Sequence, residues 1–358
     1  MNKSRIQRLI VQMEKFHLNK LVVTSPTTIR YLTDISISPG RRLFALVLDE
    51  RGNTIFVSNR MFPLKEDCGA QILWYSDWDD GTEKLANLFS DGENVGIDHD
   101  FSAGFTFALM AQKPKVRFCP GSPAIDRVRM MKEHDEIELM RRSSAMNDDC
   151  MEHLIAYISG NLSERELADR LYSLGQEIGF DDHSGGAIIS YGQNAIDAHH
   201  GPDESHLKSG DSIVMDFGFS YRGYRSDMTR TVFFQSASTA LEKIYQTVLE
   251  AQLAAIQAVR PGVPFHFIDQ VARDIICRAG YGEYFPHRVG HGIGLDVHEP
   301  PYVVGGNEMA LEPGMIFSIE PGIYQPEVGG VRIEDLILVT EDGFENLNHY
   351  TKQLQIIK

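Results

Sequence analysis

Cysteine is scarce in this sequence of 358 residues, and its four copies lie far apart. Cys68, Cys119, Cys150 and Cys277 form no CxxC pair, so their spacing excludes a thiolate zinc site and gives no disulfide framework. We therefore expect free thiols and a cytoplasmic location.

Long hydrophobic runs are also missing. No stretch approaches the roughly 20 apolar residues that a membrane-spanning helix needs. The first residues, MNKSRIQRLIVQMEKF, are charged and amphipathic and lack the apolar core of a signal peptide. We therefore expect a protein that neither crosses the membrane nor is exported.

Positive charge is in deficit, with 34 Lys and Arg against 50 Asp and Glu, a formal net charge of −16. Such a chain repels phosphate backbones and anionic lipid, which argues against nucleic acid and membrane surfaces as partners. Metal cations and small neutral or cationic ligands fit better. The hydrophobic share of 42% is ordinary for globular proteins, and the length predicts about two domains.

The first part of the chain predicts a mixed α/β domain. Apolar residues recur at three- and four-residue steps from Ile6 to Phe16, which indicates an amphipathic helix. Strands are expected at 21–24, 43–49, 53–58, 72–75 and 94–98, and helices at 82–91 and 102–112. A long charged helical pattern begins at Met131, so we place the boundary near Asp126, between domains 1–126 and 127–358.

The second domain predicts the same order of elements twice: two helices followed by strands. This repetition indicates an α+β domain with pseudo-twofold symmetry, in which helices cover one face of a curved antiparallel sheet. The expected helices are 131–158, one opened by the capping box Ser163 and Glu166, 238–259 and 266–279; the expected strands are 187–191, 211–219, 224–234, 315–320 and 331–340.

Each predicted half carries two carboxylates in apolar strands. Asp216 lies in SIVMDFGF, and Asp227 follows on the returning strand, within reach across a hairpin. Glu320 ends the strand MIFSIE, and Glu334 lies in GGVRIEDLILV. A buried carboxylate costs several kcal/mol unless it is paired or bound to a cation.

Four carboxylates around one point need either buried arginines or two divalent ions about 3.5–4 Å apart. Taken singly, each carboxylate pairs more often with an arginine, and Arg225, Arg230 and Arg332 are available. His291 adds a neutral nitrogen donor, and the glycines around it let the backbone approach closely. Four oxygen donors and one nitrogen suit manganese, cobalt, zinc or iron(II).

Five segments together, SIVMDFG, GYRSDMTRT, HRVGHGIGLDVHEPP, FSIEPGIY and GGVRIED, resemble the pita-bread metallopeptidases of the Xaa-Pro aminopeptidase and prolidase branch. Residues 1–126 resemble the creatinase-type N-terminal domain of that branch. Methionine aminopeptidases are similar only to the part after residue 131. The resemblance therefore covers essentially the whole chain.

The resemblance implies two divalent metal ions, with manganese expected first and cobalt, zinc or iron as alternatives. Asp216 would chelate one ion, Asp227 and Glu334 would bridge both, and His291 and Glu320 would complete the other. The ions would activate a water molecule as the nucleophile.

It also implies roles around the substrate. Glu320 would accept the proton of the water, His199 and His298 would lie on the substrate side, and either could donate to the developing oxyanion. His287 matches a third pocket histidine, and Arg332 matches the arginine that orients Glu334.

Two positions depart from the family pattern. The segment IDAHHGP leaves His199 or His200 as the pocket histidine, and the spacing to Asp216 favours His199. Gly185 stands where relatives commonly carry an aromatic residue, so we expect this wall of the proline pocket to be built from elsewhere.

The resulting prediction is an Xaa-Pro aminopeptidase that acts as a homodimer on proline-containing peptides. The segment YQPEVGG between the two glutamate motifs holds Glu327 and no cation, which favours a pocket open to long peptides. The alternative is an Xaa-Pro dipeptidase, in which Arg288 or a residue from the N-terminal domain of the partner subunit could bind the substrate carboxylate. A metal-free creatinase-like amidinohydrolase or a non-catalytic binding module is disfavoured because all five ligands are present.

Overall fold

The computed structural model describes residues 1–183 and 186–358. The chain forms two compact units, Met1–Arg129 and Met130–Lys358, each described by itself below. The predicted fold class is confirmed: a mixed α/β unit is followed by a unit of helices and mostly antiparallel strands. No helix in the described ranges is both long enough and apolar enough to cross a membrane.

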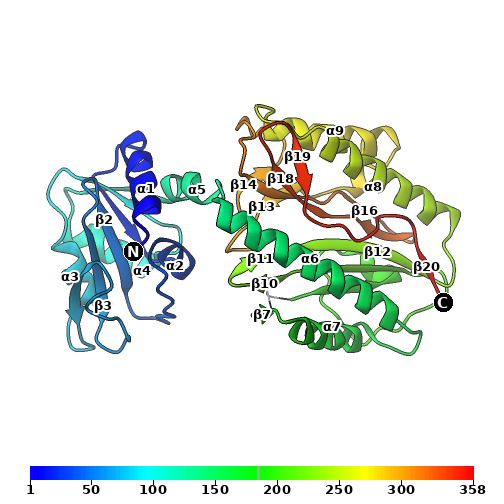
Figure 1. The fold of residues 1–358 in the computed structure, drawn as a ribbon, viewed down its shortest axis with the longest axis horizontal. Helices are drawn as coiled ribbons and strands as arrows, with labels where there is room; N and C mark the ends of the chain where they lie inside the picture. Colours follow the sequence, from blue (N-terminus) through cyan, green and yellow to red (C-terminus); the bar gives the residue numbers. More distant parts are fainter. Residues whose placement is uncertain (184–185) are drawn as a thin grey trace. The chain divides into compact units, whose positions relative to one another are not determined.

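The first unit is built on a six-stranded sheet in the order β4-β3-β2-β1-β5-β6 (Figure 1). Its middle strands are apolar on both faces, as expected where helices cover both sides of a sheet. The strands are β1 (Lys20–Val23), β2 (Phe44–Asp49), β3 (Thr54–Asn59), β4 (Gln71–Tyr75), β5 (Asn94–Ile97) and β6 (Arg117–Pro120), and the helices are α1 (Lys3–Lys15), α2 (Pro26–Thr33), α3 (Gly81–Ala86), α4 (Ala103–Gln112) and α5 (Ser122–Arg129).

Helix α1 shows where the sequence pattern is right and where it is wrong. Ile6, Leu9 and Met13 are buried, as their spacing predicts. Phe16 follows the last helical residue and is 42% exposed, so it does not continue the apolar face. The pattern extends one residue beyond the helix that it predicts.

The second unit consists of two similar halves. In the first half, α6 (His134–Tyr157) and α7 (Glu164–Ile178) precede β7 (Asp182–His183), β8 (Ile188–Tyr191), β9 (Ser212–Phe217), β10 (Phe219–Tyr221), β11 (Tyr224–Arg225) and β12 (Met228–Phe234). In the second, α8 (Thr239–Gln257) and α9 (Phe265–Arg278) precede β13 (Gly290–Gly292), β14 (Glu299–Val303), β15 (Ile316–Ile319), β16 (Gly322–Gln325), β17 (Gly329–Arg332), β18 (Asp335–Val339), β19 (Phe344–Asn346) and β20 (Ile356–Ile357).

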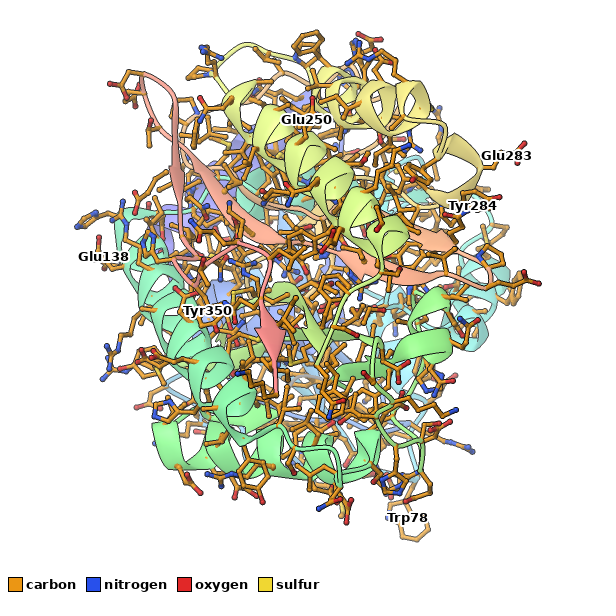
Figure 2. All side chains as sticks on the ribbon, turned by 90° about the vertical axis from the view of Figure 1, so that its right-hand side faces the viewer. Trp78, Glu138, Glu250, Glu283, Tyr284 and Tyr350 are labelled. Carbon is orange, nitrogen blue, oxygen red and sulfur yellow. The ribbon has the colours of Figure 1, made fainter. Side chains whose placement is uncertain are left out.

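A large hydrophobic cluster packs against each helix pair, and a smaller one joins the two halves. Leu154 on α6 and Leu171 on α7 belong to one buried cluster with residues of β8, β9 and β12. Val248 on α8 and Ile268 on α9 belong to another with residues of β15 and β18. Glu138 on α6 and Glu250 on α8, both labelled in Figure 2, lie on the exposed faces of these helices.

Strand ends and turns bring the carboxylates together. In the β9–β12 ladder, Asp216 faces Thr229, and Asp227 immediately precedes β12. Gly218 is required beside them, because a Cβ atom there would lie 1.9 Å from the carbonyl oxygen of Ser226. Glu320 follows β15. Both halves therefore deliver acidic side chains to one place.

Candidate metal and peptide site

A cavity of about 590 Å³ opens in the second unit. Nine of its lining residues are those predicted from the sequence, namely His199, Asp216, Asp227, His287, His291, His298, Glu320, Arg332 and Glu334. They come from strands and loops of both halves. A volume of this size is typical of a small-molecule site.

His291 presents an unprotonated nitrogen to the carboxylates. Its Nδ1 lies 3.1 Å from the carbonyl oxygen of Gly292, which can only accept, so Nδ1 donates and Nε2 carries the lone pair. Burial, followed by the charge of His298, lowers the pKa of His291 to about 3. Nε2 lies 3.3 Å from Glu320 Oε1 and 3.8 Å from Asp227 Oδ2. This arrangement of facing lone pairs is suited to share a cation.

The buried carboxylates also lack enough positive charge. Burial, then the charges of Asp216 and Glu320, raises the pKa of Asp227 well above its usual value. Burial and the charge of Asp227 do the same for Glu334. Burial raises the pKa of Glu320 to about 7, against the opposing effect of Arg332. The carboxylates repel one another in a medium that solvates charge poorly.

One carboxylate oxygen of Glu334 shows this lack of positive charge directly. Glu334 is 1% exposed, and its Oε1 has no hydrogen-bond partner among the described residues. Donor atoms of Asp227, His291 and Glu334 all lie within 4.8 Å of one another. This set of oxygen and nitrogen donors fits a divalent transition metal.

Arg332 lies beside this cluster and is 3% exposed. It donates hydrogen bonds to Asp216 Oδ2, to the Tyr324 hydroxyl at 2.7 Å and to Thr229 Oγ1 at 3.2 Å. Thr229 Oγ1 donates in turn to Glu334 Oε2 at 2.7 Å. Within the described residues, Arg332 reaches Glu334 through this hydroxyl and not directly.

Arginine pairing does not account for the other carboxylates. Arg230 forms its ion pair with Asp335, which faces away from the cavity lining, at 2.7 Å. Arg332 therefore offers the lining carboxylates one ion pair, to Asp216. Even with Arg288, the lining holds two arginines against four acidic groups.

His287 is tied into the same network. Its Nδ1 donates to the carbonyl oxygen of Arg288 at 2.7 Å, so Nε2 is an acceptor and receives the Tyr324 hydroxyl proton at 2.9 Å. Tyr324 accepts from Arg332. Burial lowers the pKa of His287 to about 4, which keeps the ring neutral near pH 7. The direction of each hydrogen bond is thus fixed in the series from Arg332 through Tyr324 to His287.

The adjacent residues His199 and His200 lie in different environments. His199 lines the cavity, whereas His200 Nε2 bonds Glu164 Oε2 at 2.8 Å and is absent from the lining. His298 also lines the cavity, with its ring edge-on to His291 at 4.2 Å between centroids. Burial and the charge of Arg288 lower the pKa of His298. Gly185, where an aromatic residue was expected in relatives, lies outside the described residues.

Sequence patterns missed several supporting residues. Ser318 accepts the backbone N–H of His291 at 3.0 Å and donates to Glu320 at 3.1 Å. Its position two residues before Glu320, on the same face of the strand, was the available signal. Thr229 lies two residues after Asp227, but its hydroxyl bonds Glu334 of the other half. Tyr324 offered no comparable signal, because its partners lie on other strands.

Comparisons with known proteins agree with this geometry. Metallopeptidase family M24 matches residues 138–341, and the creatinase/prolidase N-terminal domain matches residues 5–131. An uncharacterized peptidase of Staphylococcus aureus (strain MW2) is 34% identical over 356 residues, which cover 98% of this chain and 100% of that protein.

Solved structures point to the same family. The crystal structure of a prolidase from Thermococcus sibiricus has a TM-score of 0.94 and 34% identity, covering 100% of this chain and 99% of that one. An Xaa-Pro dipeptidase from Bacillus anthracis has a TM-score of 0.89 and 29% identity, covering 99% of both chains. The protein is therefore a metallopeptidase of family M24 with a creatinase/prolidase N-terminal domain and the pita-bread fold.

Proposed function

We propose that this metallopeptidase is an Xaa-Pro dipeptidase, which hydrolyses the bond between a first residue and a C-terminal proline. The supporting observation is full-length similarity to proteins named prolidase and Xaa-Pro dipeptidase. This proposal departs from the aminopeptidase prediction. That prediction depended on Glu327 lying near the substrate, but Glu327 is exposed at the turn between β16 and β17 and is not a cavity residue.

Arg288 supports the dipeptidase proposal. It lines the cavity, and its guanidinium lies 4.3 Å from the centre of the Tyr302 ring. Arg332, the other cation of the lining, is engaged with Asp216 and Tyr324. A guanidinium held over an aromatic ring can still bind a carboxylate with two parallel hydrogen bonds. A dipeptide offers its C-terminal carboxylate near the scissile bond.

For catalysis we propose two divalent ions, manganese first, held by Asp216, Asp227, His291, Glu320 and Glu334. When bound, such ions lower the pKa of water and polarise the scissile carbonyl. Glu320, a carboxylate of the cavity lining, would accept the proton of the water.

The remaining residues would handle the substrate. His298 and His199 border the cavity and can donate to the carbonyl oxygen as its negative charge develops. His287, with Nε2 occupied by Tyr324, would serve as part of the pocket wall. Proline nitrogen is a poor leaving group until protonated, so proton return from Glu320 would complete the cleavage.

The deciding experiment compares kcat/KM of the manganese-loaded protein for Ala-Pro, Ala-Pro-Ala and Ala-Pro amide. We expect clear preference for Ala-Pro, and Arg288→Gln should lower the efficiency for Ala-Pro by about tenfold or more while changing that for the amide little. Arg278→Gln, at the exposed end of α9, is the matched control. Preference for Ala-Pro-Ala would instead establish aminopeptidase action.

Two further properties, the oligomeric state and the location in the cell, are also proposed. The first unit contributes none of the five ligand residues, and we propose that it serves assembly of a homodimer. Sedimentation at micromolar concentration would test this against a monomer of 40.3 kDa. All four cysteines are free, in keeping with a cytoplasmic location, which cell fractionation would test.

A further inference from the structure

Glu164, the first residue of α7, is a completely buried carboxylate outside the cavity lining. It accepts four hydrogen bonds. Oε1 receives the backbone N–H of Tyr191 at 2.7 Å and the amide of Asn194 at 3.0 Å. Oε2 receives Nε2 of His200 at 2.8 Å and the backbone N–H of Asp203 at 3.0 Å. Both oxygens are therefore fully used by donors of the protein.

This arrangement argues against a second metal site. Glu164, His200 and Asp203 bring donor atoms close enough to hold an ion. However, three of the four groups that donate to Glu164 are backbone or amide N–H groups, which cannot become acceptors. An ion would have to displace all of them. The cluster is better explained as a device that holds chain segments together.

The held segment is the one that carries His199. All four donors lie within 191–203. The backbone of α7 adds two bonds, from Glu164 N–H to Ser205 O at 3.1 Å and from Arg165 N–H to Asp203 O at 3.0 Å. Helix α7 thus fixes this loop over its length.

His199 itself has little to hold its ring. Among the described residues its side chain makes no hydrogen bond, so its place in the cavity depends on its backbone. That backbone is fixed on one side by Arg332, which donates to Ala198 O at 3.3 Å, and on the other by His200, which is bound to Glu164.

We infer that Glu164, acting through His200, is a positioning residue for His199 in the peptidase reaction. The inference builds on the proposed function, since His199 has a catalytic role only if the cavity hydrolyses peptides. Small displacements of a catalytic group reduce rates by up to about 100-fold. The loss should therefore appear in turnover, with metal binding unchanged.

A double-mutant cycle tests this. Glu164→Gln keeps the size of the side chain but replaces one accepting oxygen by a donor, and it should lower kcat/KM for Ala-Pro by about 10- to 100-fold. In a His199→Ala background, Glu164→Gln should lower kcat/KM for Ala-Pro by less than about threefold, because the side chain to be positioned has been removed. In a His298→Ala background it should keep its full effect.

His200→Ala is the second variant, for the case that Glu164→Gln fails to fold; it should show the same coupling to His199. The matched control is Glu166→Gln, an exposed carboxylate of the same helix turn that bonds Ser163 N–H. Equal losses in the wild-type and His199→Ala backgrounds would overturn the inference.

A measurement without turnover separates this inference from the proposed function. The ring resonances of His199 in the NMR spectrum should shift in Glu164→Gln and stay unchanged in Glu166→Gln. A wild-type protein that cleaves no Xaa-Pro peptide would refute the proposed function alone. Unchanged His199 resonances in Glu164→Gln would refute the positioning role whatever the substrate is.

Discussion

Arg332 on β17 donates a hydrogen bond to Asp216 on β9, so an arginine from the second half of the unit neutralises a carboxylate of the first half. The same guanidinium holds Tyr324 and Thr229. This one side chain therefore links the charge of Asp216 to the positions of Tyr324 and Thr229.

Arg332→Met should destabilise the metal-free protein by about 3–5 kcal/mol, because it leaves the Asp216 charge without its buried partner. Arg332→Lys keeps a charge and should cost less. The free energy of unfolding in urea measures both. Arg278→Met, on an exposed side chain, should stay within about 0.5 kcal/mol of wild type. Equal stability of all three variants would show that the ion pair is unimportant.

Removing metal should abolish peptidase activity, and manganese or cobalt should restore it. Asp227→Asn should prevent this restoration, because the amide takes away a negative charge from the ligand cluster. Asp274→Asn, on the exposed face of α9, provides the comparison. Full turnover by the stripped protein, or near wild-type turnover by Asp227→Asn, would mean that the ligand set is wrongly assigned.

His298→Ala should lower turnover by about 10²–10³-fold, the usual loss of an oxyanion donor, while the metal content stays the same. Metal analysis beside steady-state kinetics gives both values. The expectation follows from its place next to His291 at the cavity wall. Loss of metal in this variant would make His298 a ligand instead.

Tyr324→Phe should destabilise the protein by about 1–3 kcal/mol, because Arg332 and His287 each lose a buried partner. Thermal unfolding with metal removed measures the effect. Tyr302→Phe is a suitable control, since it keeps the ring beneath Arg288. A Tyr324→Phe variant as stable as wild type would show that water replaces the hydroxyl.

His287 predicts a pH dependence. Its pKa is about 4 in the folded protein and near 6.5 in the unfolded chain, because burial disfavours the charged ring. The unfolded chain therefore binds the extra proton first, and this contribution to stability is complete above pH 6.5 and lost as pH falls to 4. Unfolding in urea at pH 7 and pH 5 should show a smaller difference for metal-free His287→Gln than for wild type. An unchanged difference would contradict the assignment.

Several features were predictable because they depend on local chemistry. Asp216 stands out as an acidic residue within an apolar strand, and Glu334 as one within an apolar segment, although that segment divides into β17 and β18 with Glu334 between them; the repeated order of helices and strands indicated two halves. Contacts between distant segments were not predictable. The roles of Tyr324 and Glu164 depend on partners from other elements, and neighbouring histidines diverge because the loop turns between them.

Two predictions from the sequence, for Phe16 and for Glu327, were wrong for the same physical reason. Phe16 continues the apolar spacing of α1, but the helix has ended and the side chain is exposed. Glu327 was assigned to the substrate pocket from its distance along the chain, whereas the β16–β17 hairpin carries it to an exposed turn. Sequence distance measures reach along the backbone and not direction in space.

The division of the proposed ligands between the two halves of the second unit has a consequence for the amount of intact protein. Asp216 and Asp227 belong to one half, and His291, Glu320 and Glu334 to the other, so bound metal would add a cross-link to the contacts that already join the halves. Ligands that bind only the folded state add stability in proportion to the logarithm of their concentration. The amount of intact protein in a cell would then follow the supply of the metal.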